Sequence, residues 1–600
     1  MAGGTEDISH VESAENLREH EAALVGAYVL PELSSHDEVA NNSIRNVFRV
    51  TKGITLANSF LMCYLYFAGT MAYIVPPTQV SFMVADLGRR DLAAWVSTAT
   101  SVGICAVLPV SGALTDVVGR RWAMIAGSLL GVAGSIVAGR ADSTKMIIAG
   151  QALCGAAIAL CFVSPAALAE IIPAFARPFW ATAQHFLGTI GQVVGPVYSG
   201  AFVKASISGW RWPFYINAII FGLGAVGTIF IYHPKSRVRA LGFSKRGVIR
   251  QIDFVGLFLF LAGVTCLLLG LSWGGNVRYG WKNAHAIAPT VIGVVIVLIV
   301  LPVYERFGCQ NAVFDRQLFR DRTFIMLNII SFVEGFALLT SSVYFPQILL
   351  QFWTKDPVTV GVYRIPFAVS GLISQTGSGL IFQKTARYKK MYIGLATLLL
   401  IGPALFGVLT PHQSVGVPLG ISVLTGLAVG GIVQVSLITA QYCVPQTKLG
   451  VSLGIINTVR VLGGAIGVAI FNSILSTRQN SHIPSAVTAA ATKAGARASE
   501  LPLIVKAAVS GNSTLLVSAT DNSTAVIGAV KLAVLNTTSA SYRIIFLSSI
   551  PFGAISLAAC FLLREVNHYM SDEVVFGLAA QEKAAPAGLR KEQETVEKNV

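Results

Sequence analysis

The sequence predicts an all-α membrane protein with fourteen transmembrane helices arranged as two related bundles. Hydrophobic residues make up 54% of the 600 residues and charged residues 12%, with a mean hydropathy of +0.66. Soluble domains carry about 25% charged residues, so this low charge indicates a polytopic membrane protein. The apolar residues form runs of spanning length, and two loops repeat one spacing pattern.

The expected elements begin after a polar tail. Residues 1–52 contain an acidic cluster and no short apolar run after an early basic region, which predicts a cytosolic tail and not a signal peptide. The expected spans are 53–75, 92–114, 122–139, 146–171, 181–203, 212–232, 254–273, 286–304, 323–346, 357–382, 391–410, 415–440, 450–475 and 543–564. Residues 565–600 form a second cytosolic tail.

Basic residues in the short loops predict the orientation. With the N-terminus inside, cytosolic loops hold 18 Lys and Arg, against 9 in the short outer loops. The long loop 477–541 then lies outside, where its three Asn-x-Ser/Thr acceptors, Asn512, Asn522 and Asn536, are predicted to be glycosylated. We expect one short surface helix in this loop, at Ala486–Ala498. The net charge of +15 is explained by this loop bias, so nucleic-acid binding is not expected.

Two loops carry the same pattern. The loop after the second span reads Gly112-x3-Asp116-x2-Gly119-Arg120-Arg121, and the loop after the tenth reads Gly379-x3-Gln383-x2-Ala386-Arg387. This repeat predicts two six-helix bundles, 53–234 and 323–564, joined by 235–322, which holds a cytosolic loop and two extra helices. Repeated halves that rock about a central site are the signature of secondary transporters.

The fifth span has a face of small residues. Gly191, Gly195 and Ser199 recur every fourth residue, which allows a neighbouring helix to approach closely, and Pro196 removes a backbone hydrogen bond. Ordinary tight packing would explain the spacing alone. The Gly-Pro pair favours a helix that moves against its neighbour.

These motifs resemble those of the major facilitator superfamily. The Gly112–Arg121 segment is similar to its loop 2–3 motif, and Gly191-x3-Gly195-Pro196-x2-Ser199-Gly200 resembles its antiporter motif. Fourteen spans match the drug:proton antiporter group. Further stretches resemble the fungal trichothecene efflux pump branch, namely Trp210–Asn217, Tyr232-His-Pro234, Gly270–Gly275 and Asn457-Thr-Val-Arg460-x2-Gly463-Gly464. The resemblance implies proton-driven export by alternating access.

Two positions depart from relatives in this group. Many relatives have an Arg in the fourth span where Gln151 stands, and many have an acidic residue in the first span, which has none here. Their proton-coupling residues are therefore not carried over to this chain.

The loop motif suggests a gating latch. A carboxylate near a helix N-terminus and arginines at helix ends can hold the two halves together in the outward-facing state. The latch candidates are Gly112, Asp116, Gly119, Arg120, Arg121, Glu170 and Arg177. The alternative is that Arg120 and Arg121 only set the topology.

Ionisable residues deep in a span are functional candidates because their burial is costly. Glu334 and Arg460 lie near the middle of the ninth and thirteenth spans, so an acid that alternates between a proton and a cationic partner would suit coupling. The alternatives are a fixed structural pair, or a Glu334 that faces the two extra helices. His185 is a third candidate, although a lone His near a helix end is more often structural.

A central pocket that is mostly apolar with a few polar anchors would suit a hydrophobic organic substrate. The candidate lining residues are Gln192, Gln375, Gln434, Gln441 and Phe336. No Walker motif or nucleophile–base constellation is present in the sequence, so we expect neither ATP-driven transport nor an enzyme. The eight cysteines show no ligand spacing, so no metal site and no cofactor beyond the proton gradient are expected.

The sequence therefore predicts a monomeric, proton-driven exporter of a small organic compound in the plasma membrane, with a vacuolar or vesicle membrane as the alternative location. One rival function is a proton-coupled siderophore–iron importer, which would share the fourteen spans. The other is a non-transporting membrane sensor, which the short tails do not favour.

Overall fold

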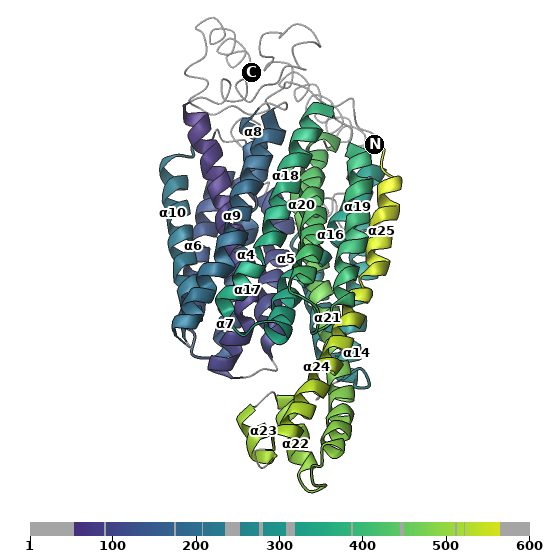
Figure 1. The fold of residues 1–600 in the computed structure, drawn as a ribbon. Coiled ribbons are helices and arrows are strands. Elements are labelled where there is room, and N and C mark those ends of the chain that lie inside the picture. The colour runs from purple at the N-terminus through teal and green to yellow at the C-terminus, as the bar shows by residue number, and fades with distance from the viewer. Residues whose placement is uncertain are drawn as a thin grey trace, which may run out of the picture.

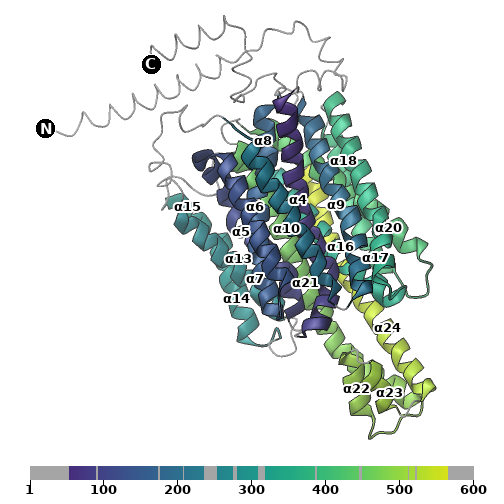
Figure 2. The same ribbon diagram turned by 90° about the vertical axis from the view of Figure 1, so that its left-hand side faces the viewer.

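The computed structural model describes residues 53–88, 92–172, 176–206, 208–234, 253–274, 280–307, 318–385, 388–444, 449–510, 513–520 and 523–564. The predicted cytosolic tails, 1–52 and 565–600, and the basic segment 235–252 lie outside the described residues. The described chain is a bundle of long helices with a smaller helical subdomain at one end (Figures 1 and 2). The two ends of the bundle are called upper and lower below, as drawn in Figure 1.

The first half of the bundle contains α4 to α10. Its helices are α4 (Ile54–Leu87), α5 (Ala93–Val118), α6 (Arg120–Gly139), α7 (Thr144–Cys161), α8 (Ser164–Ile171), α9 (Arg177–Ala205) and α10 (Trp212–Phe230). The predicted fourth span is divided into α7 and α8, because Pro165 in the first turn of α8 cannot continue the hydrogen bonding of α7. Gly119 separates α5 from α6 with φ +92°, a conformation that favours glycine.

The second half contains α16 to α25. Its helices are α16 (Arg322–Phe352), α17 (Pro357–Tyr363), α18 (Ile365–Thr385), α19 (Tyr388–Leu405), α20 (Gly416–Cys443), α21 (Leu449–Lys493), α22 (Leu501–Ser510), α23 (Ser513–Ala519), α24 (Thr524–Leu547) and α25 (Ile550–Phe561). The predicted tenth span is divided at Arg364, between α17 and α18. Between the halves lie α13 (Phe254–Gly274), α14 (Ala284–Val295) and, after a π-helical turn, α15 (Leu301–Phe307).

The described residues contain thirteen helical segments that are long and apolar enough to cross a membrane. They correspond to every predicted span except the second. The second span is α5, which is 26 residues long and carries a shorter apolar stretch, Trp95–Pro109. The all-α membrane fold predicted from the composition is therefore confirmed.

The two halves meet through two equivalent helix pairs. In one pair α5 packs against α21, and in the other α9 packs against α17 and α18. Each pair joins the second span of one half to the fifth span of the other, as a pseudo-two-fold relationship requires. Helix α13 packs against both α5 and α21, so the inserted helices lie at the edge of one of these pairs (Figure 2).

The predicted loop 477–541 is mostly helical. The helix expected at Ala486–Ala498 is present as far as Lys493, but it is the end of the long helix α21 and not a separate short helix. Helix α21 runs for 45 residues, or about 68 Å at 1.5 Å per residue, which exceeds the roughly 30 Å hydrocarbon layer. Its end packs with α22, α23 and the start of α24 around a separate apolar cluster that includes Val487, Ile504 and Val530. This protruding subdomain extends below the bundle in both views (Figures 1 and 2).

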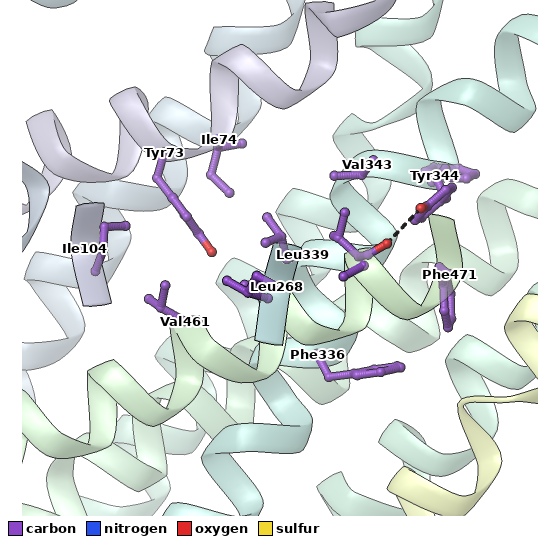
Figure 3. Packing of buried hydrophobic residues seen from close by; sticks show 14 of the residues in the cluster. Tyr73, Ile74, Ile104, Leu268, Phe336, Leu339, Val343, Tyr344, Val461 and Phe471 are labelled. Carbon is purple, nitrogen blue, oxygen red and sulfur yellow. Dashed lines mark hydrogen bonds between the residues drawn. The ribbon is translucent and has the colours of Figure 1, made fainter. Parts of the chain in front are cut away.

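The largest apolar cluster joins both halves and the inserted helices. It contains Tyr73 from α4, Ile104 from α5, Leu268 from α13 and Val461 from α21, which face one another in Figure 3. In the same view Tyr344 donates a hydrogen bond of 3.1 Å to the Val468 carbonyl, so α16 is tied to α21. The cluster lies beside the central cavity and fixes the helices that line it.

Candidate substrate cavity and its ion pair

A cavity of about 80 Å³ lies between the two halves of the bundle. The first half contributes residues from α4 and α9 together with Phe162, which directly follows α7, and the second half contributes residues from α16, α18, α20 and α21. The polar residues of its wall are Tyr66, Thr70, Tyr73, His185, Thr189, Gln192, Gln375, Asn457 and Arg460. Aromatic and aliphatic side chains cover the rest, so the cavity combines an apolar wall with a few polar anchors.

The α4 wall follows from helical spacing. Tyr66, Thr70 and Tyr73 are separated by four and three residues, which places them on one face of the helix. The hydroxyl oxygen of Tyr66 lies 3.0 Å from Nδ1 of His185 on α9. This contact orients the buried imidazole at the cavity wall.

The second polar contact of the wall joins the halves. Oγ1 of Thr189 on α9 lies 3.0 Å from Oε1 of Gln375 on α18. Both side chains are buried, and both residues line the cavity.

An ion pair lies at the wall formed by the second half. Arg460 Nε on α21 donates to Glu334 Oε2 on α16 over 2.6 Å, and Arg460 Nη1 donates to Asn457 Oδ1 over 2.7 Å. The Glu334 side chain is fully buried, and its Oε1 has no hydrogen-bond partner among the described residues. Arg460 lines the cavity, so the pair connects a buried acid to the central space.

The close approach of α16 and α21 depends on glycine. A Cβ built on Gly335 would clash with the backbone of Arg460, and a Cβ on Gly463 would clash with the backbone of Phe332. The two helices can therefore bring Glu334 and Arg460 together only because these positions lack side chains.

Above the cavity the halves touch through α9 and α20. Gln434 Nε2 donates to Thr182 Oγ1 over 2.9 Å. A Cβ on Gly379 of α18 would clash with the same Thr182 hydroxyl. These contacts close the upper side.

Below the cavity the halves touch through α9 and α17. A Cβ on Gly200 would lie 2.7 Å from the Pro357 carbonyl oxygen, and a Cβ on Gly361 would lie 2.8 Å from the Pro196 carbonyl oxygen. Lys204 Nζ lies 3.2 Å from Asp356 Oδ1 at the surface, beyond these backbone contacts. The halves are thus in contact both above and below the cavity.

Comparisons with known proteins identify the family. The family model described as fungal trichothecene efflux pump (TRI12) matches residues 54–599. The chain belongs to this family. Its fold is that of the major facilitator superfamily, and a bacterial homologue of the human lysosomal transporter Spinster, solved in an inward-facing and occupied conformation, superposes with a TM-score of 0.51. That likeness has 13% identity and covers 85% of this chain and 96% of the other.

Several curated relatives are similar over most of their length. The MFS-type transporter pydD of Acremonium sp is 26% identical over 84% of this chain and 85% of its own. The trichothecene efflux pump TRI12 of Fusarium sporotrichioides is 25% identical over 82% of this chain and 83% of its own. The efflux pump aflT of Aspergillus parasiticus is 26% identical over 65% and 76%.

In this member of the trichothecene efflux pump family, the small residues of α9 face two neighbours. Cβ atoms on Gly191 and Gly195 would press against Met71 and Val75 of α4, and Gly200 meets α17. The prediction that small residues permit close approach is confirmed, and Pro196 adds a contact across the interface between the halves.

The candidate latch residues lie at the upper side, and the bonds assigned to them stay within the first half. Arg120 Nη2 donates to Glu170 Oε1 on α8 over 2.5 Å, and Arg121 Nη2 donates to the Ile229 carbonyl of α10 over 2.6 Å. Arg177 is buried at the start of α9. Gly112 lies within α5, and the side chain of Asp116 lies outside the described residues. The expected bridge between the halves is therefore not among these bonds.

The pocket candidates divide into three groups. Gln192 and Gln375 line the cavity. Gln434 instead holds the upper contact with Thr182, and Phe336 stacks on Phe552 with ring centroids 4.5 Å apart, so neither contributes to the wall. The side chain of Gln441 lies outside the described residues.

The sequence analysis missed the aromatic part of the wall. Tyr66 and Tyr73 could have been found from their spacing on α4, and Asn457 from its place three residues before Arg460. Phe162 ends α7, and periodicity gives no signal for its orientation.

The acceptor Asn536 is exposed on α24, while Asn512 and Asn522 lie outside the described residues. Within the described part of the chain, no group of three or more His, Cys, Asp or Glu side chains could hold a metal ion.

Proposed function

We propose that this protein is a proton-driven exporter of a small hydrophobic organic compound, such as a toxin, drug or secondary metabolite, and that it works by alternating access in the plasma membrane. Relatives named as efflux pumps support export over siderophore import. The observation that carries the proposal is the Glu334–Arg460 pair at the wall of a cavity shared by both halves.

The contacts around the cavity support alternating access. Gln434 and Thr182 close the upper side, and the glycine contacts of α9 and α17 close the lower side. Rocking one half against the other would break the contacts on one side of the cavity and keep those on the other side. We assign the upper side to the cytosol and the lower side, with the protruding subdomain, to the exterior, because of the Lys and Arg distribution and the glycosylation acceptors.

The ion pair supplies a means of coupling. When Glu334 is ionised, it neutralises Arg460, and the cavity wall suits an apolar substrate taken from the cytosolic side. When a proton from outside neutralises Glu334, Arg460 carries an uncompensated charge beside the cavity, which disfavours the apolar body of the substrate there and promotes its movement outward. Loss of the proton to the cytosol restores the pair.

The role of Glu334 can be tested in proteoliposomes that hold the full chain. Wild type and Glu334→Gln are compared for export of candidate toxic compounds, with and without a proton gradient. We expect gradient-dependent export by wild type and its loss in the variant. Glu500→Gln, on the protruding subdomain, is the matched control and should export normally.

The outcomes separate the rival functions. Gradient-driven export that survives Glu334→Gln would place proton coupling elsewhere. If none of the candidate compounds is exported but a ferric siderophore is imported, the export proposal is wrong and the siderophore-importer function is right. Monodisperse elution of Glu334→Gln in detergent shows that a loss of transport is not a loss of folding.

A further inference from the structure

A second, smaller cavity of about 20 Å³ lies between the halves on the lower side. It is formed by the last part of α4, the C-terminal part of α9, Leu350 near the end of α16, and α17 with the residue that follows it. The sequence analysis assigned Pro196, Ser199 and Gly200 of this region to the antiporter motif, but it gave no role to the α4 and α17 residues that face them.

This outer cavity lies one helical turn beyond the substrate cavity on three different helices. On each of these helices a lining residue of the substrate cavity lies four residues, or about 6 Å along the helix, from a lining residue of the outer cavity. The pairs are Ile74 and Thr78, Gln192 and Pro196, and Ala368 and Arg364. A compound that leaves the substrate cavity downward therefore meets the outer cavity next.

Arg364 is buried in the wall of this cavity, with 6% of its surface exposed. Its guanidinium has no hydrogen-bond or ion-pair partner within the described part of the chain, and Nη1 is fully enclosed. The carboxylate of Asp356, at the start of α17, is instead bound by Lys204 and Thr359.

Gln79 from α4 lines the same cavity from the other half and is 2% exposed. Neither its amide nitrogen nor its amide oxygen has a partner among the described residues. Two buried polar side chains, one from each half, thus share a small cavity and leave their hydrogen-bonding groups unused.

Burying a charge without a partner is costly, and buried polar groups are nearly always hydrogen-bonded. An acceptor entering this cavity would satisfy the guanidinium, which binds carboxylates through two parallel hydrogen bonds, while the Gln79 amide donates a further one. The Lys204 side chain is 63% exposed, so its ammonium group is hydrated, and it is already paired with Asp356. Binding an anion there would satisfy no unpaired buried group.

We propose that Arg364 and Gln79 form an anion subsite that binds the carboxylate or another acidic group of the exported compound during its passage outward. The inference rests on the proposed export function and deepens it, because it assigns acidic hydrophobic compounds as preferred substrates. The same site can also hold a free small anion when no acidic substrate is present.

The test uses two probes that differ only in charge, pyrenebutyrate and its methyl ester. Binding to the purified full chain in nanodiscs is measured by fluorescence titration. Wild type is expected to bind the carboxylate roughly tenfold or more tightly than the ester, as one charge-assisted pair predicts. Arg364→Gln should remove this preference and leave ester binding unchanged, and Arg364→Lys should keep part of it.

Two controls address folding and general electrostatics. Arg364→Gln removes an unpaired buried charge, so its melting temperature should equal or exceed that of wild type. Lys204→Gln removes a nearby exposed charge and should keep the preference. Equal binding of both probes by wild type, or loss of the preference in Lys204→Gln, would overturn the subsite.

Replacing sodium chloride by sucrose, which carries no charge, identifies the resident anion. If pyrenebutyrate binds more tightly without chloride, a free anion competes for Arg364. If its binding is unchanged, the substrate alone uses the site. Both outcomes require the preference for the carboxylate over the ester, and both support the subsite. Export of the ester under a proton gradient is measured separately. Failure of ester export would count against the proposed export function, whereas the fluorescence titrations test the anion subsite.

Discussion

Arg460 Nε and Glu334 Oε2 lie 2.6 Å apart across α21 and α16, with the acid fully buried and the base at the cavity wall. The two residues are 126 positions apart in the chain. Their meeting places a buried ionisable group of the second half next to a residue that lines the cavity.

The pair makes a prediction about stability. Glu334→Gln or Arg460→Met alone should destabilise the protein by about 3–5 kcal/mol, because each leaves a buried polar partner uncompensated. The double variant should recover much of this loss. Thermal unfolding in detergent of the wild type, both single variants and the double variant measures these changes in stability. If the losses of stability in the single variants simply add in the double variant, the two residues do not interact.

Closure of the lower side can be perturbed at one glycine. A side chain at Gly361 would meet the Pro196 backbone, so Gly361→Ala should favour the outward-open state. A cysteine introduced at Gln192 should then react faster with an impermeant maleimide applied from outside.

Gly379→Ala is the matched variant on the upper side, where the added methyl group would meet Thr182. It should favour inward opening and slow the external labelling of the same cysteine. Identical labelling of both variants would contradict alternating access through these contacts.

The loop motif requires glycine at one position. Gly119 has φ +92°, so Gly119→Ala should cost about 1–3 kcal/mol of stability and lower the melting temperature. Gly394→Ala in α19 is the control, since open space surrounds it and alanine favours helix. A melting temperature unchanged by Gly119→Ala would show that the turn relaxes freely.

The protruding subdomain can report the orientation of the chain. If it lies outside the cell, the exposed Asn536 is available for glycosylation, and Asn536→Gln should reduce the mass removed by peptide N-glycosidase. A triple variant that also replaces Asn512 and Asn522 should show no mass change on treatment. A wild-type protein without glycans would remove this support for the assignment of the exterior.

The surface pair at the lower side should not set the pH dependence of transport. The Thr359 hydroxyl, followed by Lys204, holds the pKa of the Asp356 carboxyl below its ordinary value of 3.8. A lowered pKa means that the pair is present above pH 3.8 and is lost only as the pH falls through the lowered value. Asp356→Asn should therefore leave the pH profile of export unmoved between pH 5 and 8, in contrast to Glu334→Gln. A shifted profile in Asp356→Asn would contradict this assignment.

The sequence by itself determined where the spanning helices lie, and thirteen of the fourteen expected spans are long and apolar enough within the described residues. The repeat and the candidates Glu334 and Arg460 were likewise read from the sequence, because bilayer thickness and the cost of burying charge act on local sequence. It also placed small residues on α9 at helical spacing. It did not reveal that 477–541 folds into packed helices, since their apolar cluster is assembled from segments far apart in the chain.

Only the tertiary structure decided which polar residues face the cavities. Gln192 and Gln434 look alike in sequence, yet one lines the cavity and the other holds the upper contact between the halves. The sequence analysis did not single out Arg364, although it lies within the predicted span 357–382. Packing of α4, α9 and α17 buried it without a partner among the described residues. Composition and spacing specify which segments enter the membrane, whereas the partners of each side chain depend on helices brought together from both halves.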